Sequence, residues 1–353
     1  MAVEVYNDRP LLTIAIPTWN RAKYLALNLG QLMSVGSDFL KCIEILICDN
    51  ASSDDTGNVI AGSIATHLPI RHIRNPENIG SDCNIAQCFN LANGHYVMIL
   101  GDDDLLVDGA LQIILELLES RRYGVVSVRP YGYEKNFRDE YPGGNGSMHE
   151  FTDVGEFVVR LGMLSTLISA NIISKDLLPN IDAQEFCGSN LVQTNLIYLA
   201  ASSAKANMWV DKYLVACKRN NSGGYAFSQV FVDSFGAIID KFRNKSISEA
   251  AVRRLERRLL VGYYPFYIWR DRLDYKDNLV EVRRRFYSRY VDYKEFWVGV
   301  APMLWLPRPF ALLWGGVVVT LGRVLDGDFR RGMRFIIDRM LEKINHFLKK
   351  YRS

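Results

Sequence analysis

Short apolar runs alternate with amphipathic stretches over the first 130 residues of the chain. The apolar runs are rich in β-branched residues and predict strands at 11–16, 42–48, 69–74, 96–100 and 124–128. The stretches between them predict helices at about 21–34, 54–66, 81–92 and 108–121. Such alternation is typical of βαβ units, and the uniformly apolar runs at 11–16 and 96–100 indicate strands covered on both faces. We therefore predict an α/β fold with a mostly parallel central sheet.

The pattern changes after residue 130. Residues 131–150 are rich in Gly, Tyr and charge and show no periodicity, so we predict a loop there. An apolar run at 165–174, a helix at 189–203 and a strand at 209–219 follow, and from about 228 the pattern is helical and basic. The chain of 353 residues is long enough for one domain over 1–225 and a separate helical C-terminal region over 226–353.

Charge is divided unevenly along the chain. Residues 241–353 hold 25 Lys and Arg against 12 Asp and Glu, a net charge of +13, while residues 1–240 carry −10. A basic region of this kind favours an anionic membrane surface as a partner. Nucleic acid is not expected as a partner, because the aromatic residues sit in apolar runs and do not alternate with Lys or Arg.

Two segments of the C-terminal region have the composition of membrane contacts. Residues 296–322 contain one charge, Arg308, and are interrupted by prolines at 302, 307 and 309. The apolar run after the last proline is about 13 residues, shorter than the roughly 17–25 that a spanning helix needs, so we predict that it dips into the interface. Trp305 and Trp314 favour the headgroup boundary. Residues 333–348 have the spacing of an in-plane amphipathic helix on anionic lipid; a helix packed on its own domain is the alternative.

The N-terminus and the cysteines bear on where the chain acts. The N-terminus lacks a basic segment followed by a long apolar stretch, so no signal peptide is expected. The six cysteines form no CxxC pair, which favours reduced thiols. We expect a cytoplasmic protein bound peripherally to the inner face of the plasma membrane.

Three adjacent carboxylates, Asp102, Asp103 and Asp104, follow the buried run at 96–100. Ligands of open α/β sheets bind beyond the carboxyl ends of the strands. Like charges this close raise one another's pKa, and a hard divalent cation with oxygen ligands, such as Mg²⁺, would neutralise them. The alternative is a helix cap, in which Asp104 or Asp108 begins the helix at 108–121.

Asp49 follows the run at 42–48 and lies at the same expected edge. Its carboxylate could accept a hydrogen bond from a nucleobase or a ribose hydroxyl. The alternative is a turn followed by a helix cap. The absence of GxGxxG after the first strand disfavours a dehydrogenase.

Three motifs in order, LTIAIPTWNR, EILICDNASSDDT and NPENIGSDCNIAQCFNLANGHYVMILGDDD, resemble the family 2 glycosyltransferases with the GT-A fold, over residues 10–130. The resemblance implies a nucleotide-sugar donor and Mg²⁺ or Mn²⁺, with residues 10–130 as the donor-binding half and 150–225 as the acceptor half. It implies these donor-binding positions: Pro17 and Trp19 beside the base, Asp49 on the base, Gly80 and Asn84 lining the pocket, and Asp102 on the ribose. Asp103 and Asp104 are the implied metal ligands, and the cluster fits the family's DxD motif in two registers.

The acceptor side departs from the family pattern. Members usually carry a Glu-Asp pair some 80 to 90 residues after the acidic cluster, and its Asp deprotonates the acceptor. Residues 183–190, AQEFCGSN, lack that pair. Glu185 or Asp182 could serve as the catalytic base, the alternative being that both are solvated loop acids. Inversion and retention at the sugar both stay open.

Three further segments, SANIISKDLL, GSNLVQ and KRNNSGG, are similar to bacterial transferases that build surface polysaccharides, including abequosyltransferase-like ones. The resemblance implies O-antigen or capsule synthesis on a lipid-linked saccharide acceptor. The alternative is a transferase-like, membrane-bound binding or scaffold protein that has lost its base.

Overall fold

The computed structural model describes residues 9–34, 36–66, 68–119, 122–144, 146–219, 226–274 and 278–325. The chain divides into two compact units. The first takes in residues up to 225 together with 234–252, and the second takes in 226–233 and the chain from 253 onward. Helices over 234–252 therefore belong with the α/β unit, although the basic, helical composition begins before them.

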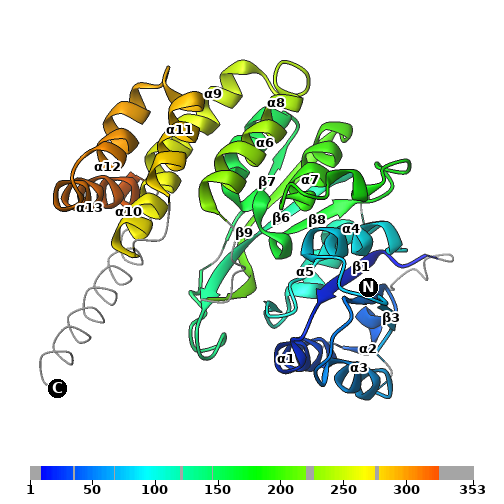
Figure 1. Ribbon diagram of the computed structural model, residues 1–353. Helices are drawn as coiled ribbons and strands as arrows, with labels where there is room; N and C mark the ends of the chain where they lie inside the picture. The colour runs from blue at the N-terminus through cyan, green and yellow to red at the C-terminus, as the bar shows by residue number, and fades with distance from the viewer. Residues whose placement is uncertain are drawn as a thin grey trace, which may run out of the picture. The chain divides into compact units, whose positions relative to one another are not determined.

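The first unit contains a sheet of nine strands among the described residues, in the order β3-β2-β1-β4-β8-β6-β9-β5, with β7 paired to β9 (Figure 1). The strands are β1 (Leu12–Thr18), β2 (Ile43–Asp49), β3 (Ile70–Arg74), β4 (Tyr96–Ile99), β5 (Leu105–Leu106), β6 (Tyr123–Tyr133), β7 (Met148–Phe151), β8 (Asn171–Ser174) and β9 (Ala206–Lys218). The four strands β3, β2, β1 and β4 are parallel, and β6 is parallel to β9. Strand β8 is antiparallel to both β4 and β6.

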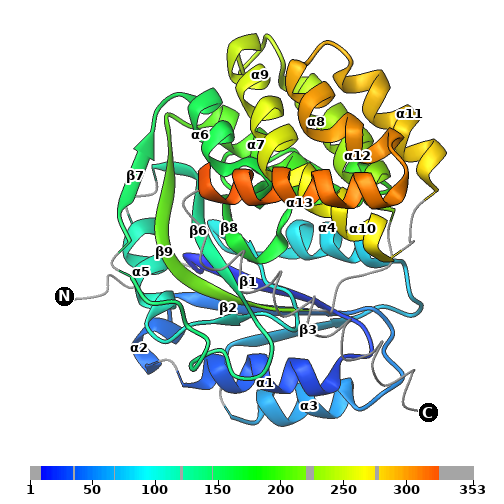
Figure 2. The same cartoon turned by 90° about the vertical axis from the view of Figure 1, so that its left-hand side faces the viewer.

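Helices cover both faces of the parallel strands. Figure 2 shows α1 (Ala22–Met33) and α3 (Thr56–Ile64) on one side and α4 (Ser81–Leu91) on the other. Every residue of β2 is buried, as the apolar composition of these strands predicts. Strands β1, β2 and β4 are thus fixed from both sides, whereas β3, at the edge of the sheet, is only half-buried.

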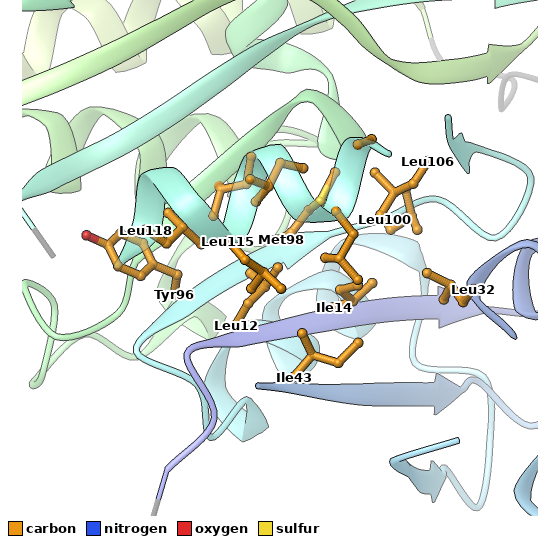
Figure 3. Close-up of a cluster of buried hydrophobic side chains, with 14 of the residues drawn as sticks. Leu12, Ile14, Leu32, Ile43, Tyr96, Met98, Leu100, Leu106, Leu115 and Leu118 are labelled. Atoms are coloured by element: carbon orange, nitrogen blue, oxygen red, sulfur yellow. The ribbon is translucent and has the colours of Figure 1, made fainter. Parts of the chain in front are cut away.

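A single apolar cluster joins the sheet to α1, α3 and α5 (Ala110–Leu118). In Figure 3 the side chains of Leu12 and Met98, from adjacent strands, point toward Leu115 of α5. Each fully buried side chain of this size contributes about 1.5–3 kcal/mol. This packing holds the strand ends, and the polar residues that follow them, in fixed positions.

The predicted strands and helices of residues 11–121 are all present, within a few residues of their predicted ends. The prediction of a loop over 131–150 is wrong at both ends. Strand β6 continues through Tyr133, and β7 begins at Met148. Both are paired with β9, whose paired residues lie 56 or more positions later in the chain, so local periodicity does not reveal them.

The rest of the first unit contains shorter elements: α2 (Ser37–Leu40), α6 (Val154–Leu161), the 3₁₀ turns η1 (Gly162–Thr166), η2 (Ile168–Ala170) and η3 (Ala183–Phe186), α7 (Val192–Ser203) and α8 (Phe235–Phe242). Helix α9 (Glu249–Arg258) leads into the second unit.

The second unit is helical throughout its described part. Its elements are the π-helical turns η4 (Gln229–Ser234), η5 (Leu259–Tyr263) and η6 (Phe296–Val300), with α10 (Tyr264–Asp274), α11 (Leu279–Tyr290), α12 (Ala301–Trp305) and α13 (Arg308–Leu325). Tyr264 and Tyr290 are buried in its core and share a hydrogen bond of 2.8 Å between their hydroxyl oxygens.

The apolar segment 296–322 is broken between α12 and α13, at Leu306 and Pro307, where the prolines predicted an interruption. No helix in the described part of the chain is both long and apolar enough to cross a membrane. The amphipathic helix predicted over 333–348 lies outside the described residues.

Candidate active site

The carboxyl ends of β1, β2 and β4 meet at one edge of the sheet. Thr18, at the end of β1, is in register with Asp49, at the end of β2. The Thr18 hydroxyl donates a hydrogen bond of 2.8 Å to Oδ2 of Asp102, which follows β4. The structure therefore brings Asp49 and Asp102 to the edge where ligands of parallel sheets bind.

Asp102 is a buried carboxylate, with 9% of its surface exposed. Burial, together with the charges of Asp103 and Asp104, raises the pKa of Asp102 to about 7, against the opposing hydrogen bond from Thr18. A pKa this far from the usual range of an aspartate marks a candidate functional group.

Asp104 is held by groups that arrive from distant parts of the chain. Its Oδ2 accepts a hydrogen bond from the Ser169 hydroxyl at 2.5 Å, and its Oδ1 accepts one from the Lys218 backbone N–H at 3.1 Å. Burial raises the pKa of Asp104 to about 6, with a further contribution from Asp103. The turn η2 and the end of β9 thus fix the orientation of this carboxylate.

Asp103 lies closer to solvent than its two neighbours. Its side chain is 19% exposed, and Oδ2 lies 3.5 Å from a guanidinium nitrogen of Arg21. Sequence reasoning missed Arg21, although it ends the first quoted motif. It places a positive charge beside the acidic cluster.

The capping interpretation of the cluster is wrong. Gly109 precedes α5 without a side-chain cap, and both Asp108 carboxylate oxygens accept hydrogen bonds from Arg138. The Asp104 oxygens face Ser169 and Lys218 instead. The cluster is therefore not explained by the helix that follows it.

Asp49 is completely buried, and both of its oxygens have protein partners. Oδ1 accepts a hydrogen bond of 2.8 Å from Ser52 N–H, and Oδ2 lies 2.6 Å from a guanidinium nitrogen of Arg74. Asp49 therefore stabilises the turn after β2. It does not cap α3, whose first flanking residue is Asp55.

The remaining predicted donor residues surround this edge. Trp19 is 51% exposed and Pro17 is half-buried within β1. Gly80 is exposed, with φ of +86°, a backbone conformation that favours glycine. Asn84, four residues later, donates a hydrogen bond of 2.9 Å to the Cys48 carbonyl at the end of β2.

A network of amide side chains links the ends of β2 and β3 to the segment before α4. Asn50 donates to Asn78 at 2.7 Å and accepts from the Ile79 N–H and from Asn75, each at 3.0 Å. Asn75 also donates to Asn84 at 3.4 Å. Sequence reasoning missed this network, although its asparagines stand in the quoted motifs. It positions Gly80 and Asn84.

The loop that carries Asp182 and Glu185 is attached to the first turn of α4. Gln184 donates to the Cys83 carbonyl at 3.3 Å, and Asn190 N–H donates to Asp82 at 2.9 Å. The structure thus brings the expected acceptor-side loop to the segment that holds Asn84.

The two candidate bases in this loop have different surroundings. Asp182 Oδ1 accepts hydrogen bonds from the Gln184 N–H and from Asn90, and these hydrogen bonds lower the pKa of Asp182. Glu185 has an exposed side chain. Asp182 therefore acts as the cap of η3 and is a weak base, while the Glu185 side chain is open to solvent.

Asp103 and Asp104 offer oxygen ligands for a divalent cation. Within the described residues, no three His, Cys, Asp or Glu side chains are arranged as a complete metal site. Mg²⁺ needs only one or two protein carboxylates when phosphate oxygens and water complete its shell. Burial raises the pKa of Asp104, and a cation beside it would favour its charged form, so these carboxylates fit such a cation.

The fold and the polar strand ends define a GT-A-type domain. S. aureus TarS 1–349 in complex with UDP superposes with a TM-score of 0.57, at 16% identity, over 91% of each chain. At this identity the likeness concerns the fold. Residues 13–169 match the model described as glycosyl transferase family 2. This match confirms the resemblance of residues 13–169 to the family 2 glycosyltransferases.

Two curated relatives each match about a third of the chain. Abequosyltransferase RfbV of Salmonella typhimurium is 38% identical over 112 residues, which is 31% of this chain and 33% of that protein. A GalNAc(5)-diNAcBac-PP-undecaprenol beta-1,3-glucosyltransferase of Campylobacter jejuni is 31% identical over 108 residues, 30% of this chain and 34% of that protein. The matched segment thus spans about a third of these relatives.

Proposed function

We propose that this chain is a glycosyltransferase that moves a sugar from a nucleotide-sugar donor to a lipid-linked saccharide in the synthesis of a bacterial surface polysaccharide, O-antigen or capsule. The observation that carries the proposal is the cluster Asp102–Asp104 at the edge of the sheet where ligands bind, inside the segment matched by the family 2 model. Burial raises the pKa of both Asp102 and Asp104 in this cluster. The similarity to transferases of bacterial polysaccharides supports the acceptor class.

The donor would lie across the ends of β1, β2 and β4. Trp19 is exposed and can cover the base, and Asp102 can accept a hydrogen bond from a ribose hydroxyl. Asp49 can bind the base only if a ligand takes over part of its contact with Arg74 or Ser52. Gly80 and Asn84 would line the pocket.

A divalent cation, Mg²⁺ or Mn²⁺, held by Asp103 and Asp104, would supply positive charge at the departing diphosphate. Arg21, beside Asp103, adds a fixed positive charge on the same side. Ser169 and Lys218 keep the Asp104 carboxylate from turning away. Groups held in advance in this way need no rearrangement when charge develops.

We assign proton removal from the acceptor hydroxyl to Glu185. Asp182 is occupied as a cap and its pKa is lowered, so it accepts a proton poorly. The expected result is that Glu185→Gln lowers kcat roughly 10²- to 10⁴-fold. Asp182→Asn is the matched control, since it also removes one carboxylate from the loop. An equal loss in both variants would contradict the assignment.

The test of the function uses the purified full chain, a panel of nucleotide sugars with Mg²⁺ or Mn²⁺, and membrane lipid extract as acceptor. We expect Asp103→Asn to lower transfer roughly 10²-fold or more, because it removes electrostatic stabilisation of the leaving group. Asp108→Asn is the control, since Asp108 is an exposed carboxylate in the same loop. Equal activity of Asp103→Asn and the control would overturn the proposal.

The same assay separates an enzyme from a scaffold. A scaffold would bind a nucleotide sugar, raising the thermal stability of the chain, yet show neither transfer nor donor hydrolysis. We place the enzyme at the cytoplasmic face of the plasma membrane, where a lipid-linked acceptor would be reached. The exposed apolar face of α13 and the basic charge of residues 241–353 support peripheral binding there.

A further inference from the structure

The second unit contains a pocket of about 530 Å³ near the start of α13. Three arginines line it: Arg272 at the end of α10, Arg283 on α11 and Arg308 at the first position of α13. Asp271 is the one acidic side chain among the lining residues, so the lining carries a net positive charge. The pocket is therefore built to face an anion.

The arginines are fixed by backbone carbonyls. Arg272 donates to the Leu306 carbonyl at 2.9 Å, and Arg283 donates to the Leu304 carbonyl at 2.7 Å. Arg308 donates to the carbonyls of Arg272 and Leu273, each at 3.0 Å. The neutral carbonyl partners of Arg272 and Arg283 orient these two guanidinium groups and leave their charges in place.

The positive charges lie close enough to oppose one another. Burial, followed by the charges of Arg283 and Arg308, lowers the pKa of Arg272. Nε of Arg272 is buried and has no hydrogen-bond partner within the described part of the chain. An anion that accepts hydrogen bonds from these groups would reduce the repulsion between the arginines and would give Nε of Arg272 a partner. The planar guanidinium group suits a pair of phosphate oxygens.

The rim of the pocket is apolar and exposed. Trp305 is 44% exposed and Leu306 is 40% exposed, and Arg283 lies 5.9 Å from the centre of the Trp305 ring. The exposed apolar side chains continue along one face of α13 at helical spacing: Phe310, Leu313, Trp314, Val317 and Leu321. Exposed apolar faces of this kind mark membrane or partner contacts.

We propose that this arginine-lined pocket binds the phosphate headgroup of an anionic membrane lipid, with the lipid chains beside the apolar face of α13. Charge complementarity selects the phosphate, and the contiguous apolar face selects a ligand that carries acyl chains. The proposed function includes contact with a membrane, and this pocket would be the site of that contact. The pocket rests on the proposed function only in that the chain acts at a membrane. Vesicle binding is measured without any donor, so failure of headgroup binding and failure of sugar transfer are separate results.

The test measures binding of the full chain to vesicles of phosphatidylcholine containing phosphatidylglycerol, at one ionic strength. Arg272→Gln with Arg283→Gln is expected to weaken binding roughly ten- to thirtyfold. The control is Arg257→Gln with Arg284→Gln, which removes the same charge from arginines paired with Glu295 and Glu281. A smaller loss in the control supports the pocket, and an equal loss in both pairs overturns it.

A second variant tests the pocket independently, in case the double arginine variant does not fold. Leu306→Glu adds a negative charge at the exposed rim, and Leu27→Glu adds the same charge at an exposed position of α1. Only Leu306→Glu is expected to weaken vesicle binding. Soluble glycerol phosphate, which has the headgroup without the chains, is expected to compete weakly. Tight pocket-dependent binding of glycerol phosphate without vesicle binding would assign the site to a free phosphate and overturn the lipid assignment.

Discussion

Burial disfavours the charged form of the carboxyl groups of Asp102 and Asp104. Each side chain is held in the protein interior next to Asp103, and the pKa values of about 7 and about 6 reflect this burial. A protein that only needed a stable turn here would place neutral residues at these positions, because uncompensated buried charge is destabilising. In the proposed function, a cation or a donor hydroxyl at this edge would favour the charged forms of these carboxylates.

Asp102→Asn should stabilise the ligand-free chain near neutral pH. The folded pKa of Asp102 lies above its unfolded value of 3.8, so its contribution to stability is present below pH 3.8 and is lost as pH rises through about 7. The variant does not undergo that loss, so its free energy of unfolding above pH 7 should exceed that of the parent chain by about 2–4 kcal/mol. Thermal unfolding at a series of pH values measures the difference, which should vanish near pH 4.

Asp108→Asn is the control, because its expected effect on stability at neutral pH is opposite to that of Asp102→Asn. Hydrogen bonds from Arg138 and Gln31 lower the pKa of this exposed carboxyl, so its contribution is present at neutral pH and is lost on acidification. The variant should be slightly less stable than the parent at neutral pH. If both variants shifted stability in the same direction at neutral pH, the burial of Asp102 would not be the cause.

At the scale of elements, the parallel strands and their helices followed from local patterns because each pattern reports which face is buried. The acidic cluster was likewise placed at a sheet edge by its position after a buried strand. The orientation of Asp104 could not be predicted, because Ser169 and Lys218 reach it from 65 and 114 residues away. The extension of β6 to Tyr133 was missed for the same reason, since its partner is β9.

Close approach of two strands makes Gly94 a sensitive position. A Cβ at Gly94 would lie 2.5 Å from the Thr13 backbone nitrogen and 2.7 Å from the Tyr96 carbonyl oxygen. Both are backbone atoms of paired strands, β1 and β4, and cannot move independently. Gly94→Ala should therefore destabilise the chain by at least about 2 kcal/mol, measured by denaturant unfolding.

Gly62→Ala is the matched control on α3. A Cβ at Gly62 meets nothing within 4 Å, and the residue is exposed inside a helix. The substitution should stabilise the chain by about 0.5–1 kcal/mol. We expect Gly94→Ala to lower the free energy of unfolding and Gly62→Ala to raise it. An unchanged free energy of unfolding for Gly94→Ala would show that β4 does not approach β1 as described.

At the scale of the whole molecule, the charge asymmetry and the apolar face of α13 predict two separable components of membrane binding. Attraction between the +13 region, residues 241–353, and anionic lipid is screened by salt, whereas burial of apolar side chains is not. Binding to anionic vesicles should therefore weaken as salt is raised and then reach a plateau that salt does not remove.

The plateau is assigned to α13. Phe310 and Leu313 are 63% and 73% exposed, and moving such side chains into the acyl region contributes about 1.5–3 kcal/mol each. Phe310→Gln with Leu313→Gln should abolish the residual binding at high salt and leave the salt-dependent part in place, as vesicle sedimentation would show. Met33→Gln with Leu27→Gln, at exposed positions of α1, is the control. Equal residual binding in both pairs would mean that another surface enters the bilayer.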